Sequence, residues 1–251
     1  MTPGDATRLV DFTSPLFNFR DVGGLAAADG ATVRHGVLFR SDTLTALRED
    51  DRERFAALGV HTVIDLRHAR ELASFGRAPE WCCTAWHSVP LTNPAWRGED
   101  YSPEAGVAAF LTARYLETAE LAAADIVRAL ELIATGSGPT VVHCLGGRDR
   151  TGIVVALTLE LAGVSDEDIA ADYALTEHGT ARYLAWQRVN RPERPPLEPY
   201  LASTPAEAMR AFLDALRERH GSVEGYLTGA GMAAESVAAL RVRLREERPL
   251  R

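Results

Sequence analysis

The chain has 251 residues, of which 46% are hydrophobic and 25% are charged, and its formal net charge is −8. This composition excludes a largely disordered chain, and the length is sufficient for a core that needs no disulfide or metal staples. The acidic balance argues against a general nucleic-acid-binding protein. We expect one domain that spans residues 1–251.

Cysteine usage and apolar runs indicate the cellular context. The three cysteines, Cys82, Cys83 and Cys144, are too few for a disulfide framework, and adjacent Cys82 and Cys83 lack the spacing of metal ligands. The sequence therefore predicts neither a metal site nor a cofactor, and it favours a reducing compartment. No stretch resembles a signal peptide or reaches the roughly 20 apolar residues of a membrane span. We expect a cytoplasmic protein without a membrane span; export without a signal and the oligomeric state stay open.

Short strands and turns dominate the first part of the chain. The expected elements are a strand at 9–12, a loop at 18–24, a hairpin arm at 32–39, a helix at 50–58, strands at 60–66 and 84–91, and an irregular loop at 92–101. The turn signals are Gly23-Gly24 and Asp29-Gly30. Asp65 and Arg67 lie where a strand ends, which is where open α/β sheets place ligand contacts.

Helices dominate the second part. The expected elements are a helix at 103–135, a strand at 140–143, helices at 151–161 and 165–175, and two closing helices at 205–219 and 236–247. The helix at 151–161 is apolar almost all round, so we expect it to be buried. Residues 179–203 differ, because four arginines alternate with aromatics and a run of prolines. A nucleic-acid surface is one interpretation of such a stretch, but the acidic total disfavours it.

The segment from Val141 to Gly152 carries the chemistry. It predicts a buried strand, a glycine-bearing loop and the first turn of a helix. Five residues separate Cys144 from Arg150, and a loop of that length can surround one phosphate-sized anion. The N-terminal end of the helix favours the thiolate form of Cys144, which is the reactive form. Arg150 can bind two oxygens of the anion as a planar fork.

The residues between these two also have expected roles. Inward N–H groups of the loop would hold phosphoryl oxygens, and glycines permit that backbone shape. The hydroxyl of Thr151 can donate to the sulfur and make it a better leaving group. The predicted phosphate-binding residues are Leu145, Gly146, Gly147, Arg148 and Thr151.

This loop resembles the His-Cys-x5-Arg-Ser/Thr signature of cysteine-dependent phosphatases, in a bacterial branch of tyrosine and phosphoinositide phosphatases. Further matches follow the family's order: the segments at 18–24, 36–42 and 63–67, Glu71, and the segment at 221–226. The resemblance therefore spans nearly the whole chain. One departure is Arg148, where the family commonly has lysine, and this weakens any inference about phosphoinositide preference.

The resemblance implies an α/β fold with a central, mostly parallel sheet flanked by helices and a helical lid at 179–204. It also implies hydrolysis of phosphate monoesters through a phosphocysteine on Cys144, with protein phosphotyrosine as the first substrate class and dual specificity or phosphoinositide activity as additions. No cofactor is implied. The residues expected to support the loop are His143, Asp65, Arg40 and Arg20.

The leaving group needs a proton from a carboxylic acid within hydrogen-bond reach. Asp149 is the first choice, which the resemblance supports, and Asp65 and Asp100 are rivals. Two other function classes stay open. One is a phosphate-binding protein without turnover. The other is an arsenate-reducing or sulfur-transfer enzyme, in which Cys82 or Cys83 would pair with Cys144 or a persulfide would form.

Overall fold

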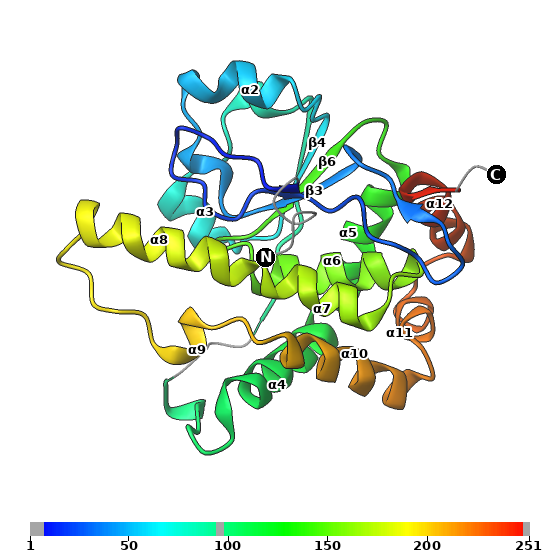
Figure 1. The fold of residues 1–251 in the computed structure, drawn as a ribbon. Helices are drawn as coiled ribbons and strands as arrows, with labels where there is room; N and C mark the ends of the chain where they lie inside the picture. Colours follow the sequence, from blue (N-terminus) through cyan, green and yellow to red (C-terminus); the bar gives the residue numbers. More distant parts are fainter. Residues whose placement is uncertain (1–7, 94–97, 248–251) are drawn as a thin grey trace.

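The computed structural model describes residues 8–93 and 98–247, and its centre is a five-stranded sheet (Figure 1). The strands lie in the order β1 (Arg20–Asp21), β3 (Leu38–Ser41), β6 (Thr140–His143), β4 (Thr62–Asp65) and β5 (Ala85–Ser88). All neighbours run parallel except β1, which is antiparallel to β3. The predicted mostly parallel sheet is therefore confirmed.

Helices flank this sheet, as predicted. Those before the central loop are α2 (Arg52–Ala56), α3 (Ala69–Phe75), α4 (Gly106–Leu121) and α5 (Ala123–Thr135). Those after it are α6 (Asp149–Leu161), α7 (Asp166–Ala174), α8 (Thr176–Asn190), α9 (Pro199–Ala202), α10 (Ala206–His220), α11 (Val223–Gly229) and α12 (Ala234–Leu244). In Figure 1, α2 lies at one end of the molecule and α4 and α10 lie together at the other.

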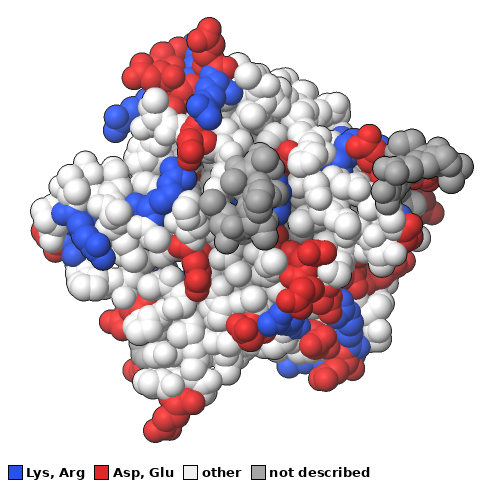
Figure 2. All heavy atoms as spheres, in the orientation of Figure 1, with Lys and Arg blue, Asp and Glu red and all other residues white. Residues whose placement is uncertain are grey.

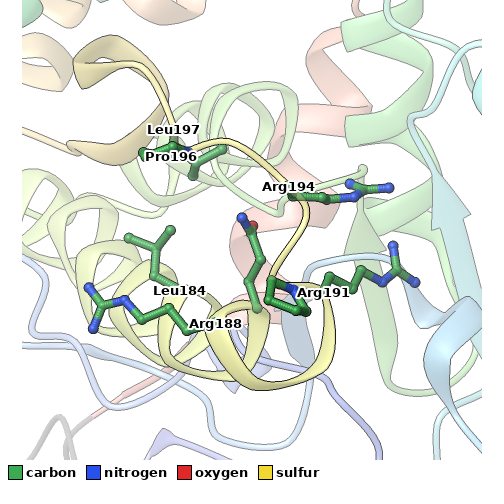
Figure 3. Close-up of a pocket in the computed structure, with 8 residues that line it drawn as sticks. Leu184, Arg188, Arg191, Arg194, Pro196 and Leu197 are labelled. Carbon is green, nitrogen blue, oxygen red and sulfur yellow. The ribbon is translucent and has the colours of Figure 1, made fainter.

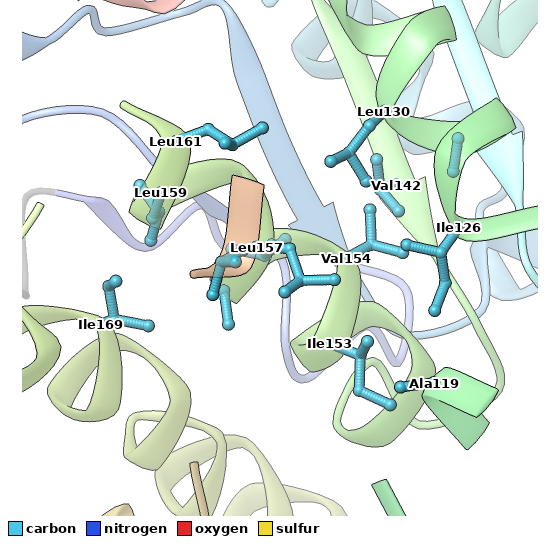
Figure 4. Close-up of a cluster of buried hydrophobic side chains, with 14 of the residues drawn as sticks. Ala119, Ile126, Leu130, Val142, Ile153, Val154, Leu157, Leu159, Leu161 and Ile169 are labelled. Atoms are coloured by element: carbon cyan, nitrogen blue, oxygen red, sulfur yellow. The ribbon is translucent and has the colours of Figure 1, made fainter. Parts of the chain in front are cut away.

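The two faces of the sheet pack into different apolar clusters because side chains alternate along a strand. On β6, Val142 joins the main cluster and Val141 joins a smaller one; on β4, Ile64 and Val63 divide in the same way. Helical side chains dominate the main cluster, where Val142 lies near Ile126, Leu130 and Val154 (Figure 4). The smaller cluster is covered by the N-terminal segment and α2.

The predicted buried helix is confirmed as α6, which begins at Asp149, two residues earlier than expected. Its side chains are buried from Thr151 to Leu159, and it packs beneath the central loop. This extensive burial leaves the N-terminal end of α6 little freedom to move relative to β6. The predicted strand at 140–143 is confirmed with the same bounds.

Two expectations for the first part of the chain are wrong in detail. Residues 9–12 form only an isolated bridge from Leu9 to Arg20. The run at 32–39 is not one hairpin arm. Its first two residues form β2 (Thr32–Val33), which pairs with β7 (Arg245–Glu246), whereas β3 joins the main sheet. A strand of two residues is too short to show a hydrophobic period, so its formation depends on pairing with the distant C-terminal segment and is not visible in the local sequence.

The helical part of the chain also differs from expectation. The predicted helix at 103–135 is two helices, because Ala122 leaves the helical region with φ −112° and ψ 22°. Helices α3 and α11 were not predicted; each has only 7 residues, too few for a clear apolar period. The predicted helix at 165–175 is confirmed as α7, whose N-cap hydroxyl on Ser165 accepts from the N–H of Asp168 at 3.2 Å.

One further expectation falls partly outside the described residues. Residues 94–97 of the predicted irregular loop at 92–101 are not described, and residues 98–100 form a short 3-10 turn. Among the described helices, none combines the length and apolar character needed to cross a membrane. The closing helices are confirmed as α10 and α12.

Candidate active site

The central loop, residues 144–148, connects β6 to α6 at the carboxyl edge of the sheet. The register aligns His143 with Ser41 of β3 and with Asp65 of β4, so three strand ends meet there. The loop therefore lies at the edge where parallel sheets place ligands.

Donors from outside the loop hold three of its carbonyl groups. The backbone N–H of Thr43 donates to the carbonyl of Leu145 at 3.0 Å, and Asn18 Nδ2 donates to that of Gly146 at 3.1 Å. Arg40 Nη2 donates to the carbonyl of Gly147 at 2.9 Å. A trans peptide directs its N–H opposite to its C=O, so the following N–H groups face the concave side. This is a geometry that can bind an anion.

Only one of the two loop glycines is needed for this shape. Gly147 has φ +67°, and a Cβ atom there would lie 2.4 Å from the Ser41 carbonyl oxygen. Gly146 has neither a positive φ nor a neighbour within 4 Å of the position of a Cβ atom. The shape of the loop therefore requires glycine at 147, whereas a Cβ atom at 146 would meet no neighbour.

Cys144 lies directly after β6, is 2% exposed and belongs to the main apolar cluster. Burial lowers the pKa of the nearby Arg150 guanidinium. The hydrogen bonds to Glu71 and the Coulombic interaction with Cys144 outweigh burial and raise that pKa. The neighbouring His143 is fully buried, and its Nδ1 lies 3.1 Å from the Cys144 carbonyl oxygen. Burial lowers the pKa of His143, so its ring is neutral at pH 7. The protonated Nδ1 of the neutral ring can donate a hydrogen bond to the Cys144 carbonyl and so fix the backbone at that residue.

Arg150 is held by Glu71 through two parallel hydrogen bonds, from Nη1 to Oε2 at 2.6 Å and from Nη2 to Oε1 at 2.7 Å. Glu71 also accepts from the N–H of His68 at 2.8 Å and so caps α3. Burial opposes ionisation of Glu71, but the hydrogen bonds from Arg150 outweigh it and lower the pKa of the carboxyl. The guanidinium is thus oriented by a helix that sequence reasoning missed.

Asp149 is held through a single oxygen. Tyr115 donates its hydroxyl to Asp149 Oδ1 at 2.7 Å, and Arg148 Nε donates to the same atom at 2.8 Å. The Tyr173 hydroxyl lies 2.5 Å from that of Tyr115, and both rings are buried. Burial raises the pKa of Tyr115, with the nearby Asp149 charge as a second cause, so this hydroxyl remains a donor. The Asp149 side chain is 27% exposed, so the carboxyl can meet a ligand.

Arg148 turns its side chain away from the loop. Its Nη1 donates to the carbonyls of Leu201 at 2.8 Å and Ser203 at 3.0 Å, beside α9. The guanidinium therefore ties the loop to the predicted lid segment. Thr151 is also buried, and its Oγ1 has no hydrogen-bond partner among the described residues.

The rival acids lie in other surroundings. Asp65 is buried and binds Arg67 with both oxygens, at 2.9 Å to Nε and 2.7 Å to Nη2. Asp65 Oδ2 also lies 3.6 Å from His143 Nε2, which places it behind the loop as a support. Asp100 is partly exposed and lies 3.6 Å from Arg114. The structure therefore brings Asp149 alone of the three into the turn that carries Arg150.

A buried charge cluster underlies the loop. Asp172 of α7 binds Arg40 at 2.7 Å and Arg20 at 3.3 Å, and it also pairs with Arg8. Burial and the neighbouring Arg40 charge lower the pKa of Arg20 to about 9, although Asp172 opposes them. The expected supporting role of Arg40 thus has a direct contact, whereas Arg20 acts through Asp172 and Asn18. Sequence reasoning missed Asp172, and its one signal was a carboxylate among the apolar positions of a helix.

The other cysteines lie on the opposite face of the sheet. Cys82 is buried in the smaller apolar cluster and Cys83 packs against it, whereas Cys144 belongs to the main cluster. The two faces are separated by the sheet itself, so the cysteine pairing that arsenate reduction would require is absent from this structure. Among the described residues, no group of three His, Cys, Asp or Glu side chains could hold a metal ion.

Comparison with known proteins gives sequence matches over most of the chain. Residues 13–246 match the tyrosine phosphatase family. The triple specificity protein phosphatase PtpB of Mycobacterium tuberculosis is 30% identical, over 90% of this chain and 95% of the relative. A tyrosine-protein phosphatase of Nostoc commune is 29% identical, over 82% of this chain and 73% of the relative. The solved structure of Pseudomonas aeruginosa TpbA covers 94% of this chain with 16% identity and a TM-score of 0.31.

Proposed function

The chain belongs to the tyrosine phosphatase family, and on that premise we propose that it hydrolyses phosphate monoesters through a phosphocysteine on Cys144. One observation carries this proposal. The loop after Cys144 has three carbonyls held outward by external donors, which leaves its N–H groups to face an anion, and Arg150 is fixed beside it by Glu71.

The reaction has two displacements at phosphorus. In the first, the Cys144 thiolate forms a sulfur–phosphorus bond while the ester oxygen leaves with a proton. In the second, water attacks phosphorus, the sulfur–phosphorus bond breaks, and inorganic phosphate departs. The loop N–H groups and the Arg150 guanidinium stabilise the equatorial oxygens in both steps. The buried Thr151 hydroxyl, which lacks a partner among the described residues, is available to donate to the departing sulfur.

Asp149 is the proposed proton donor in the first step and acceptor from water in the second. Its position at the first residue of α6 and its partial exposure support this role. Tyr115 and Arg148 both engage Oδ1, so Oδ2 is the oxygen available to the ester. Tyr115 is therefore proposed as a positioning residue for the acid.

The proposed substrate class is phosphotyrosine in proteins, with phosphoserine, phosphothreonine and phosphoinositides as the additional classes to be tested. The name of the mycobacterial relative, a triple specificity protein phosphatase, supports testing more than one class. The test is a turnover panel of phosphotyrosine, phosphoserine and phosphothreonine peptides and phosphoinositides, with Cys144→Ser as the blank. Release of phosphate from none of them above that blank would refute the proposal.

Substitution of Asp149 by asparagine is expected to lower kcat/KM for phosphotyrosine peptides about 100-fold, the lower range for loss of a general acid. The kcat/KM for para-nitrophenyl phosphate should fall much less, because its leaving group needs little protonation in the first step, which is the step that kcat/KM reports. Steady-state kinetics on the two substrates measures the difference. Equal losses on both would assign Asp149 to structure, since a distorted loop would slow both reactions alike.

Substitution of Tyr115 by phenylalanine is expected to lower kcat/KM for phosphotyrosine peptides at least about 10-fold, because a hydrogen bond to a charged group contributes roughly 1.5–3 kcal/mol. The loss should again be smaller on para-nitrophenyl phosphate. The matched control is Tyr226→Phe, which removes a buried hydroxyl that donates to the Ala119 carbonyl of the same helix at 2.7 Å. If both variants show the same leaving-group dependence, Tyr115 has no specific role toward Asp149.

A further inference from the structure

The distal half of α8 and the residues that follow it form a pocket of about 310 Å³. Figure 3 shows Arg191 and Arg194 extending to the same side of this pocket, while Arg188 extends to the opposite side. The remaining lining residues are Leu184, Gln187, Pro192, Pro196 and Leu197. The pocket thus has cations on two sides and apolar groups between them.

The three pocket arginines are exposed, and among the described residues none of them forms an ion pair. Arg182, earlier on α8, differs because it pairs with Asp11 at 2.9 Å. Figure 2 shows basic side chains at the distal end of α8 with largely uncharged surface around them. In a chain of net charge −8, this is a local site for an anionic partner.

Gln187 also lines the pocket, and unlike the three arginines its side chain is buried. It is 6% exposed, and its Nε2 donates to the Pro195 carbonyl at 3.3 Å. A carbonyl can only accept, so this contact assigns the orientation of the amide. Its Oε1 is buried without a partner among the described residues. A buried acceptor of this kind needs a donor, and a bound ligand can supply it.

The pocket belongs to a segment that is tied to the candidate active site. After the pocket the chain forms α9, and Arg148 of the central loop binds the carbonyl of Leu201 within α9 and that of Ser203 directly after it. The segment that lines the pocket is therefore anchored to the central loop at its far end.

We propose that this pocket binds an extended acidic peptide segment of the protein substrate. Carboxylates on both sides of the segment would pair with Arg188 and with Arg191 and Arg194, and a backbone N–H would donate to Gln187 Oε1. The proposal rests on the proposed function for its assignment to a substrate. An anionic membrane surface is the less suitable partner, since it cannot enter a concave pocket and offer a donor to a buried amide.

Fluorescence anisotropy with the full chain tests the proposal. The probe is a labelled, unphosphorylated peptide with glutamate at alternate positions, and its comparator has glutamine at those positions. We expect the acidic peptide to bind more tightly, and Arg191→Gln with Arg194→Gln to weaken it about 2- to 30-fold, as for two exposed ion pairs. The charge-matched control is Arg52→Gln with Arg219→Gln, two exposed arginines elsewhere on the surface.

Equal binding of the two peptides, or equal losses in the two double variants, would overturn the proposal. A second contrary outcome involves vesicles of phosphatidylcholine and phosphatidylserine. If the pocket variant loses binding to these vesicles, and the two peptides bind equally well, the pocket is a membrane-binding surface and the proposal is wrong. In turnover assays, kcat/KM should fall in the pocket variant only for phosphopeptides with acidic flanks and not for para-nitrophenyl phosphate. If the protein binds the acidic peptide but hydrolyses none of the phosphoesters, the pocket is a peptide-binding site and the proposed function is wrong.

Discussion

Replacement of Cys144 by serine is expected to abolish phosphate release, with kcat lowered by at least about 10⁴-fold, as for loss of other enzymatic nucleophiles. A serine hydroxyl is far less acidic than a thiol, and Asp149 cannot activate it in the first step, because in that step the proposed role of Asp149 is to carry the proton for the leaving group. His143 is unsuited to that task because it is buried and its Nδ1 faces the Cys144 carbonyl. The substitution is nearly isosteric, so the loop and its affinity for phosphate should survive.

Phosphate release from a phosphotyrosine peptide measures the loss, and mass spectrometry after acid quenching of the parent enzyme tests for a phosphoryl adduct on Cys144. The matched control is Cys82→Ser, since Cys82 is also buried but lies in the smaller apolar cluster. We expect that variant to keep its activity. Substantial turnover by Cys144→Ser, or an adduct on another residue, would contradict the phosphocysteine mechanism.

Replacement of Asp172 by asparagine is expected to destabilise the fold by about 3–5 kcal/mol, the usual cost of removing one partner from a buried ion pair. The side chain of Asp172 is 1% exposed, and it is the shared carboxylate of Arg8, Arg20 and Arg40. Without it, three guanidinium groups would repel one another in the interior. The Arg40 contact to the Gly147 carbonyl would shift as a consequence, so activity should fall as well.

Urea unfolding measures this change, with Asp214→Asn as the control. Asp214 is exposed and lies 3.3 Å from Arg217, so its loss should cost less than about 1 kcal/mol. The arginines lower the pKa of Asp172 below its usual 3.8, although burial acts in the opposite sense. Its stabilisation is therefore complete above pH 3.8 and lost as the pH falls below that value. The difference between the parent protein and the variant should shrink in acid, and a constant difference would contradict the ionic explanation.

The elements that were predicted correctly are specified by residues that lie close together in the sequence. The strand at 140–143, the loop after it and the buried helix from Asp149 follow one another without interruption, so a strand pattern, a glycine and an apolar run describe them locally. The same is true of the Ser165 cap of α7. The spacing of Cys144 and Arg150 is likewise visible in the sequence alone.

The contacts that organise the site join distant segments. Tyr115 reaches Asp149 across 34 residues, Arg150 reaches Glu71 across 79, and Arg40 reaches Asp172 across 132. No local pattern identifies such partners, because a carboxylate in a sequence has the same appearance whether it is exposed or surrounded by arginines. The sequence by itself determined the strand at 140–143, the loop after it and the buried helix, since hydrophobic period and residue type act over a few positions. Only the tertiary structure decided which side chains hold the loop and Asp149, since packing brings those groups together.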